Sequence, residues 1–130
     1  TLDRMEMPEC ICHIDANADN FVFDQQGDIF LIDWEYAGMQ DPHVDIAMFA
    51  IYSMYDQPQI DHLIDLYFEH SVSETIRYKI YAYVAICGLL WSNWCEYKQS
   101  LGLDFGEYSL AQYRYAKEYS QKVLRYLERK

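Results

Sequence analysis

Two short apolar segments joined by a turn constrain the first third of this 130-residue chain more than any other feature. Residues 21–23 and 28–33 are rich in β-branched and aromatic side chains, which favour strands. The turn between them carries Gly27, which can adopt a positive φ. We therefore predict an antiparallel hairpin. The polar loops on either side then leave the same end of the hairpin, so that Asn20 and Asp33 lie close together.

The polar residues around this hairpin follow the order of a kinase catalytic loop. His13-x-Asp15 is followed five residues later by Asn20, and Asp33 comes after the second strand. In kinases the first Asp contacts the substrate hydroxyl, while the Asn and the later Asp hold a metal ion. Asp15 is therefore the candidate catalytic residue, and Asn20 and Asp33 offer the oxygen donors that Mg²⁺ prefers. The structural alternative is an Asp in a turn, an Asn that caps it and an Asp that ends a strand.

Three further polar residues are expected to support these loops. His13 fits a hydrogen-bond anchor at the start of a loop better than it fits a catalyst. Asp41 and Asp45 stand at the entrance to a predicted helix, where we favour structural bracing over catalysis. Asp45 could cap that helix or accept hydrogen bonds from the backbone amides of the loop.

The rest of the chain follows a helical pattern, with apolar residues at a 3.6-residue period. The predicted helices run from Asp45 to Met54, from Pro58 to Phe68, from a Ser71–Glu74 capping box to about Ser100, and from about Glu107 to Glu128. The centre of the long third helix, residues 82–94, is apolar nearly all round, so we expect it to be a buried spine. We expect residues 1–12 to be a connector. The fold class is therefore α+β and mostly helical: a short β-hairpin plus a helical bundle, in a single domain over residues 1–130.

Charge and hydropathy exclude some functions. The net charge of -11 and the pI near 4.5 argue against nucleic-acid binding, which uses basic surfaces. Eight Asp and Glu residues but no Lys or Arg lie between His13 and Asp45, so a cation is expected nearby. The longest apolar run, residues 80–91, is shorter than the roughly 20 residues of a membrane span. Cys87 and Cys95 are expected to be buried, reduced thiols, which fits a cytoplasmic location.

Trp91 and Trp94 lie three residues apart on one face of the long predicted helix. Aromatic side chains can surround a quaternary ammonium ion through cation–π contacts. Aromatic residues at helical spacing are more often part of a core, however, and from the residues alone the core interpretation is favoured.

The combined motifs resemble those of the choline/ethanolamine kinases, and most closely those of bacterial choline kinases. The resemblance lies in the His13-x-Asp15-x4-Asn20 loop, the Asp33-Trp34-Glu35-Tyr36-Ala37 run and the Asp41-Pro42-x2-Asp45-Ile46-Ala47 run. The wider relatives are aminoglycoside phosphotransferase-like enzymes, whose fold is similar to that of the protein kinases. The resemblance covers most of the chain, which implies the C-terminal lobe of such an enzyme.

This resemblance implies roles for the candidate residues. Asp15 would face the choline hydroxyl, and Asn20 and Asp33 would bind Mg²⁺. The residues implied for the choline pocket are Trp91, Trp94, Tyr36 and a tyrosine of the last helix, with Tyr115 the best match and Tyr113 the alternative, while Glu35 would balance the positive charge of the ligand. With this resemblance, a choline-binding cage that includes Trp91 and Trp94 becomes the favoured interpretation.

The resemblance also implies ATP as co-substrate and phosphocholine as product. The N-terminal nucleotide-binding lobe of the same polypeptide is expected to be absent from this chain, so that the chain alone would be inactive. Two alternatives stay open: an aminoglycoside or other amino-alcohol phosphotransferase, and a non-catalytic choline-binding module. A tyrosine-rich surface could also form a homodimer.

Overall fold

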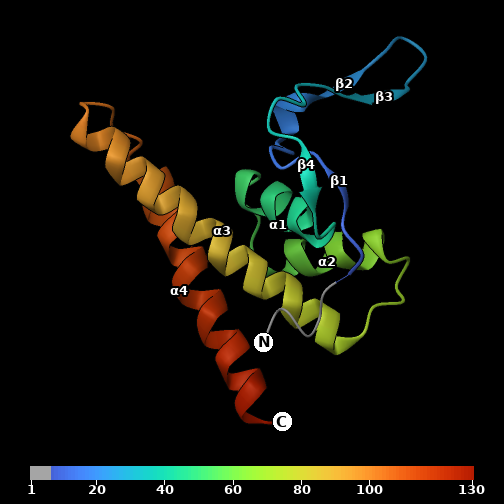
Figure 1. Cartoon of the computed structure of the whole chain (residues 1–130), viewed down its shortest axis with the longest axis vertical. Helices are drawn as coiled ribbons and strands as arrows, with labels where there is room; N and C mark the ends of the chain where they lie inside the picture. The colour runs from blue at the N-terminus through green and yellow to red at the C-terminus, as the bar shows by residue number, and fades with distance from the viewer. Residues whose placement is uncertain (1–6) are drawn as a thin grey trace.

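The computed structural model describes residues 7–130 and is mostly helical, with two small β-sheets (Figure 1). Its elements in chain order are β1 (Cys10–Cys12), the 3-10 turn η2 (Ala18–Asn20), β2 (Phe21–Phe23), β3 (Ile29–Leu31), β4 (Gly38–Gln40), α1 (His43–Tyr52), α2 (Gln57–Tyr67), α3 (Glu74–Ser100) and α4 (Glu107–Glu128). The four predicted helices are confirmed to within a few residues. In Figure 1 the long helices α3 and α4 run side by side, and the β2–β3 hairpin projects away from them.

The predicted hairpin is confirmed. β2 and β3 are antiparallel, with Phe21 opposite Leu31 and Phe23 opposite Ile29, and Gly27 in the turn has a φ of 87°. Phe21 packs edge-on against Phe49 of α1, with ring centroids 5.6 Å apart. An open apolar cavity of about 610 Å³ lies between the hairpin and helices α1 and α2.

A second pair of strands was not predicted. β1 pairs with β4 in antiparallel register, with Cys10 opposite Gln40 and Cys12 opposite Gly38. The expectation of a connector over residues 1–12 is therefore wrong for residues 10–12, while residues 1–6 lie outside the described part of the chain. This pairing closes the loop after β3 back onto the segment that precedes His13, so it fixes both ends of the candidate catalytic region.

The helix caps differ from the predicted pattern in one place. Helix α3 begins at Glu74 with Ser73 as its N-cap, whose Oγ accepts a hydrogen bond from the Ile76 amide at 3.2 Å. The capping box predicted from Ser71 and Glu74 is therefore wrong, because the first helical residue comes later than that box requires. A reciprocal capping box instead opens α2, where Asp56 and Gln59 exchange side-chain-to-backbone hydrogen bonds.

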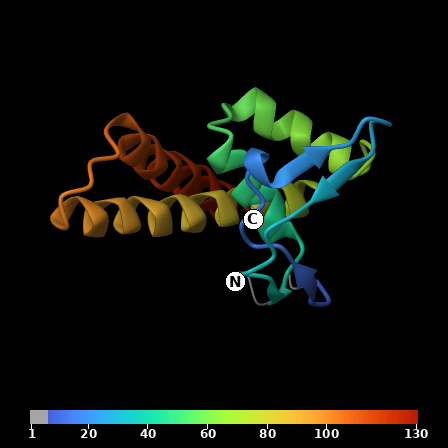
Figure 2. The same ribbon diagram turned by 90° about the horizontal axis from the view of Figure 1, so that it is seen from above.

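The core lies where α1, α2 and α4 meet the first half of α3. Its fully buried members include Ile51, Ile60, Ile80 and Val84. Gly88 lets α4 approach α3 closely, since a Cβ there would lie 2.8 Å from the Gln112 carbonyl oxygen. Seen from above in Figure 2, α3 and α4 extend together beyond the other elements.

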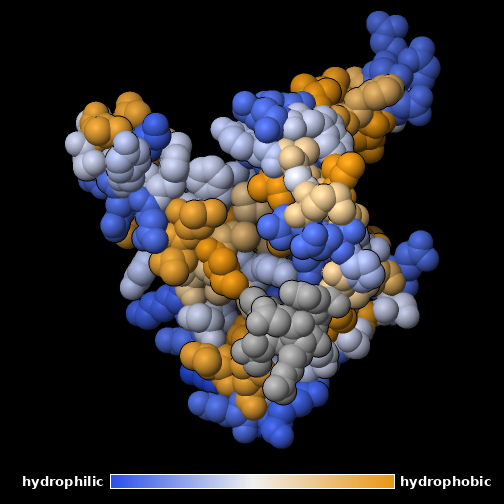
Figure 3. Space-filling model, in the orientation of Figure 1, coloured by the Kyte–Doolittle hydropathy of each residue, from blue (hydrophilic) through white to orange (hydrophobic). Residues whose placement is uncertain are grey.

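The expectation that residues 82–94 form a buried spine is only partly right. Cys87 and Cys95, about two turns apart on α3, are both buried, as predicted. In contrast, Ile86 and Leu90 are more than half exposed. Figure 3 shows hydrophobic residues at the surface along α3. No helix in residues 7–130 is long and apolar enough to cross a membrane.

Candidate active site

The loop that carries Asp15 is held by the carboxylate of Asp45. The backbone amides of His13 and Ile14 donate to the two oxygens of Asp45, each at 2.8 Å. Ile14 has a φ of 70°, which is unfavourable for a β-branched residue, and the double hydrogen bond holds it in this conformation. Of the two roles considered for Asp45, the geometry gives it the second, binding the amides of the loop.

His13 ties this loop to the end of the hairpin. Its side chain is buried, and Nε2 lies 2.7 Å from the carbonyl oxygen of Ile32. The ring of Trp34 packs against the imidazole with centroids 4.9 Å apart. His13 thus occupies the place of a structural anchor, because its side chain contacts Ile32, the residue that precedes Asp33.

Asn20 and Asp33 lie at the same end of the hairpin. The Ile32 amide donates to the carbonyl oxygen of Asn20 at 2.9 Å, which places the residues before β2 and after β3 side by side. The Asn20 side chain is buried, and its Nδ2 donates to the Asp15 carbonyl oxygen at 2.8 Å. This orientation leaves the Asn20 Oδ1 without a donor in the described part of the chain. Asp33 is exposed and has a φ of 62°, again an unusual backbone conformation.

These two residues fit a magnesium ion that is completed by phosphates and water. Mg²⁺ is usually held by one or two carboxylate or amide oxygens of the protein, with the remaining ligands supplied by a nucleotide and solvent. Asn20 offers one free amide oxygen and Asp33 an exposed carboxylate. Residues 7–130 contain no cluster of three or more His, Cys, Asp or Glu side chains able to hold a metal by themselves. A metal here would therefore need a phosphorylated co-substrate.

The negative charge of Asp15 acts on two tyrosines. The hydroxyl of Tyr52, the last residue of α1, is buried, and burial together with the Asp15 carboxylate raises its pKa. Tyr108, on the first turn of α4, has its pKa raised to about 12, by burial first and then by Cys95 and Asp15. Neither residue was identified from the sequence as part of a site.

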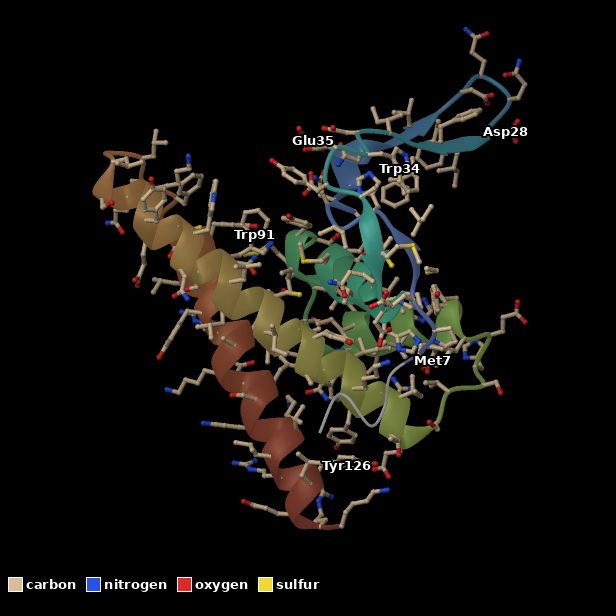
Figure 4. The ribbon with its side chains drawn as sticks, viewed as in Figure 1. Met7, Asp28, Trp34, Glu35, Trp91 and Tyr126 are labelled. Atoms are coloured by element: carbon tan, nitrogen blue, oxygen red, sulfur yellow. The ribbon has the colours of Figure 1, made fainter. Side chains whose placement is uncertain are left out.

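Aromatic rings extend this environment along α3. The rings of Tyr52 and Trp91 have centroids 5.3 Å apart, those of Trp91 and Trp94 are separated by 5.2 Å, and Phe105 lies 5.1 Å beyond Trp94. We call Tyr52, Trp91, Trp94 and Phe105 the aromatic cluster. Trp94 is 38% exposed, so this end of the cluster is accessible, whereas Tyr52 and Trp91 are half-buried and pack against the core. In Figure 4, Trp91 leaves α3 on the side that faces α1 and the loops.

The other predicted pocket residues occupy different surroundings. Glu35 and Tyr36 are exposed on the loop between β3 and β4, and neither makes a ring or hydrogen-bond contact with the aromatic cluster in residues 7–130. Tyr113 is also exposed. Tyr115 is half-buried, and its hydroxyl donates to the Tyr55 carbonyl oxygen at 2.6 Å. That hydrogen bond ties α4 to the segment after α1, so the hydroxyl of Tyr115 serves a helix contact.

One sequence signal could have identified Tyr52. It lies seven residues after Asp45, which is two turns along the same face of α1. Since Asp45 holds the loop that carries Asp15, a side chain on the same face two turns later lies next to that loop. Tyr108 and Phe105 follow a helix break and carry no comparable signal.

Asp41 belongs to a buried polar cluster behind the site. It forms an ion pair with Lys79 of α3, accepts a hydrogen bond from the Tyr83 hydroxyl at 3.0 Å and another from the His43 amide at 3.0 Å. Burial by itself would raise the pKa of Asp41, but Lys79 and these two hydrogen bonds together lower it. Burial and the positive charge of Lys79 lower the pKa of His43. Asp41 thus fixes the end of β4 to α1 and α3, which fits the bracing role expected for it.

The lowered pKa of His43 predicts that the protein loses stability below neutral pH. The unfolded chain binds a proton at the ordinary value of about 6.5, whereas the folded chain resists it, so acidification below about pH 6.5 favours unfolding. Urea unfolding measured between pH 7 and pH 5 should therefore show a falling free energy, with a shallower dependence in His43→Gln. His62→Gln, which changes an exposed histidine, is the matched control and should keep the dependence of the unaltered chain. An equally steep dependence in His43→Gln would contradict the assignment of this pH dependence to His43.

The lowered pKa of Asp41 adds a second loss of stability, which begins only when the pH falls below the ordinary range of an aspartate near pH 4.

Comparison with known proteins bears on the family and the fold of this chain. The profile of the phosphotransferase enzyme family matches residues 1–78. Protein LicA of Haemophilus influenzae is 31% identical over 105 residues, which cover 76% of this chain and 39% of that protein. The crystal structure of LicA in complex with AMP superposes with a TM-score of 0.74 at 31% identity, over 94% of this chain and 42% of that one. The choline kinase LicA from Streptococcus pneumoniae gives a TM-score of 0.69 at 29% identity, over 91% and 42%.

These matches confirm the predicted fold class and the resemblance to choline kinases. They also show that the chain spans about two-fifths of the length of the relatives it matches.

Proposed function

Because this chain belongs to the phosphotransferase enzyme family, we propose that it forms the catalytic and substrate-binding lobe of an ATP-dependent choline kinase. The observation that carries this function is the position of Asp15, on a loop fixed by Asp45 and next to the aromatic cluster. A carboxylate beside a wall of aromatic rings suits a substrate with a hydroxyl at one end and a quaternary ammonium at the other.

In the proposed reaction Asp15 orients the choline hydroxyl and accepts its proton. The hydroxyl oxygen forms a bond to the γ-phosphorus of ATP as the bond from that phosphorus to the bridging β-phosphate oxygen breaks, and ADP leaves with the electron pair. The proton on Asp15 then passes to solvent. Phosphoryl transfer needs mainly positioning and charge neutralisation, and the hydrogen bonds that fix residues 13–15 supply the positioning.

Asn20 and Asp33 would hold Mg²⁺ against the phosphates of the nucleotide. When bound, the metal ion neutralises charge on the transferred phosphoryl group. The Asn20 amide is suited to this because its Nδ2 is engaged by the Asp15 carbonyl and its Oδ1 is free. The reaction is proposed to take place in the cytoplasm, because it would use ATP.

The trimethylammonium group of choline would lie against the aromatic cluster. Cation–π attraction to Trp91 and Trp94 requires no hydrogen-bond acceptors, which matches a surface made of rings. Glu35 would balance the remaining charge, and Tyr36 and Tyr115 stay candidates for the outer wall. A polycationic aminoglycoside would need several carboxylates in place of these rings, so it is the less favoured substrate.

The nucleotide is proposed to lie against a second lobe of the same polypeptide. The chain spans about two-fifths of the length of the matched relatives, and Asn20 and Asp33 would bind only a metal ion on the phosphates of the nucleotide. Catalysis would then require the full-length protein, while this chain retains the surface for choline.

Titration of this chain with choline, followed by tryptophan fluorescence, tests the function directly. Trp91 and Trp94 are the expected reporters, so choline should change the emission saturably, while kanamycin should not. The matched control is Trp34→Phe, which removes the third tryptophan on the far side of the loop and should keep the response (Figure 4). A response to kanamycin alone would favour the aminoglycoside phosphotransferase, and turnover of neither substrate by the full-length protein would favour the non-catalytic module.

A further inference from the structure

The hydroxyl of Tyr52 is a buried polar group with no hydrogen-bond partner within 3.5 Å among residues 7–130. A buried donor left unpaired costs free energy, because it has lost water without gaining a replacement. Its ring is fixed at the end of α1 by the contact with Trp91 at 5.3 Å. The Nε1 of Trp91 is likewise buried and unpaired in the described structure. Two unpaired donors therefore meet in the aromatic cluster, beside the loop of Asp15.

The charged group that acts most strongly on the Tyr52 hydroxyl is the Asp15 carboxylate. That carboxylate is one of the influences that raise the pKa of Tyr52, so the hydroxyl remains protonated and can donate a hydrogen bond throughout the physiological range. One oxygen of Asp15, Oδ2, already lies 3.5 Å from the Nδ2 of Asn20. Hydrogen bonds of catalytic groups are often long without substrate and shorten once it is bound.

We propose that Tyr52 is a positioning residue, whose hydroxyl donates to the Asp15 carboxylate in the substrate complex and turns it toward the substrate hydroxyl. This inference rests on the function proposed above. Tyr52 would act through Asp15 and not on the phosphoryl group itself. Its ring would at the same time form the wall between the carboxylate and Trp91, which separates the hydroxyl end of the substrate from its ammonium end.

The variant Tyr52→Phe tests this role, because it removes the hydroxyl and keeps the ring against Trp91. In the full-length protein we expect kcat for choline to fall by about 10-fold to 100-fold, with KM within about twofold. The fluorescence titration midpoint for choline should also stay within about twofold. The matched control is Tyr119→Phe, since the Tyr119 hydroxyl is also buried and unpaired but its ring contacts Tyr81 and Tyr115.

Each other outcome overturns a different statement. An unchanged kcat in Tyr52→Phe, or a raised KM with normal kcat, overturns the positioning role and leaves the proposed function intact. Loss of kcat together with a lowered Tm would mean a structural role and also overturns it, because removing an unpaired buried hydroxyl should not lower Tm. In an Asp15→Asn background the further change Tyr52→Phe should have no added effect on turnover. Failure of the unaltered full-length protein to phosphorylate choline would overturn the proposed function and this inference with it.

Discussion

Replacing Asp15 with asparagine in the full-length protein is expected to lower kcat for choline by about 10³-fold and to leave choline binding within about twofold. The amide can no longer accept the proton of the substrate hydroxyl, yet it has nearly the same shape as the carboxylate. The loop should keep its conformation, because the contacts that hold it use the backbone of residues 13–15 and the carboxylate of Asp45. Steady-state kinetics give kcat, and tryptophan fluorescence gives the dissociation constant of choline.

The control for this variant is Asp19→Asn, the same chemical change on an exposed residue of the same loop. It should keep kcat within about twofold, because Asp19 lies on the η2 turn and its side chain faces solvent. Turnover above a tenth of the unaltered rate in Asp15→Asn would contradict the role of Asp15 as proton acceptor. A large loss in Asp19→Asn would show that the effect comes from the charge of the loop and not from one carboxylate.

Local patterns predicted the hairpin and the four helices because each depends on neighbouring residues. The turn needs a residue such as Gly27 that tolerates positive φ, and the strands need alternate packing of short apolar runs. The adjacency of Asn20 and Asp33 follows from hairpin geometry alone. The part of the site that could be predicted is therefore the part built from the two loops at one end of the hairpin, which carry Asn20 and Asp33.

Contacts between distant segments were not predictable in the same way. Tyr52 meets Asp15, and Trp91 meets Tyr52, only because α1 and α3 pack together behind the loop. Tyr115 stays the pocket residue expected on the last helix, and its contact with the Tyr55 carbonyl oxygen could not be read from the sequence. Tyr108 is the residue of that helix whose pKa the charge of Asp15 helps to raise. Ile86 and Leu90 on α3 are likewise exposed because few elements cover that side of the helix. The apolar composition of the helix does not reveal which of its sides is covered.

The largest expected effect on stability comes from Lys79→Met. Lys79 is fully buried and forms an ion pair with Asp41, which is itself buried. Methionine has a similar length but no charge, so Asp41 would be left as an uncompensated buried carboxylate. Breaking such a pair from one side costs about 3–5 kcal/mol, and we expect the free energy of unfolding in urea to fall by that amount at pH 7.

Two comparisons separate the ion pair from simple repacking. Lys117→Met changes an exposed lysine of α4 and should alter the free energy of unfolding by less than about 0.5 kcal/mol. The double variant Lys79→Met with Asp41→Asn removes both charges, and it should be more stable than Lys79→Met alone because no buried charge is left unpaired. A double variant that is less stable than both single variants would contradict this explanation. Asp41 also holds the end of β4, which pairs with β1 directly before His13. The variants that change the stability of the buried cluster are therefore expected to change the geometry of the Asp15 loop as well.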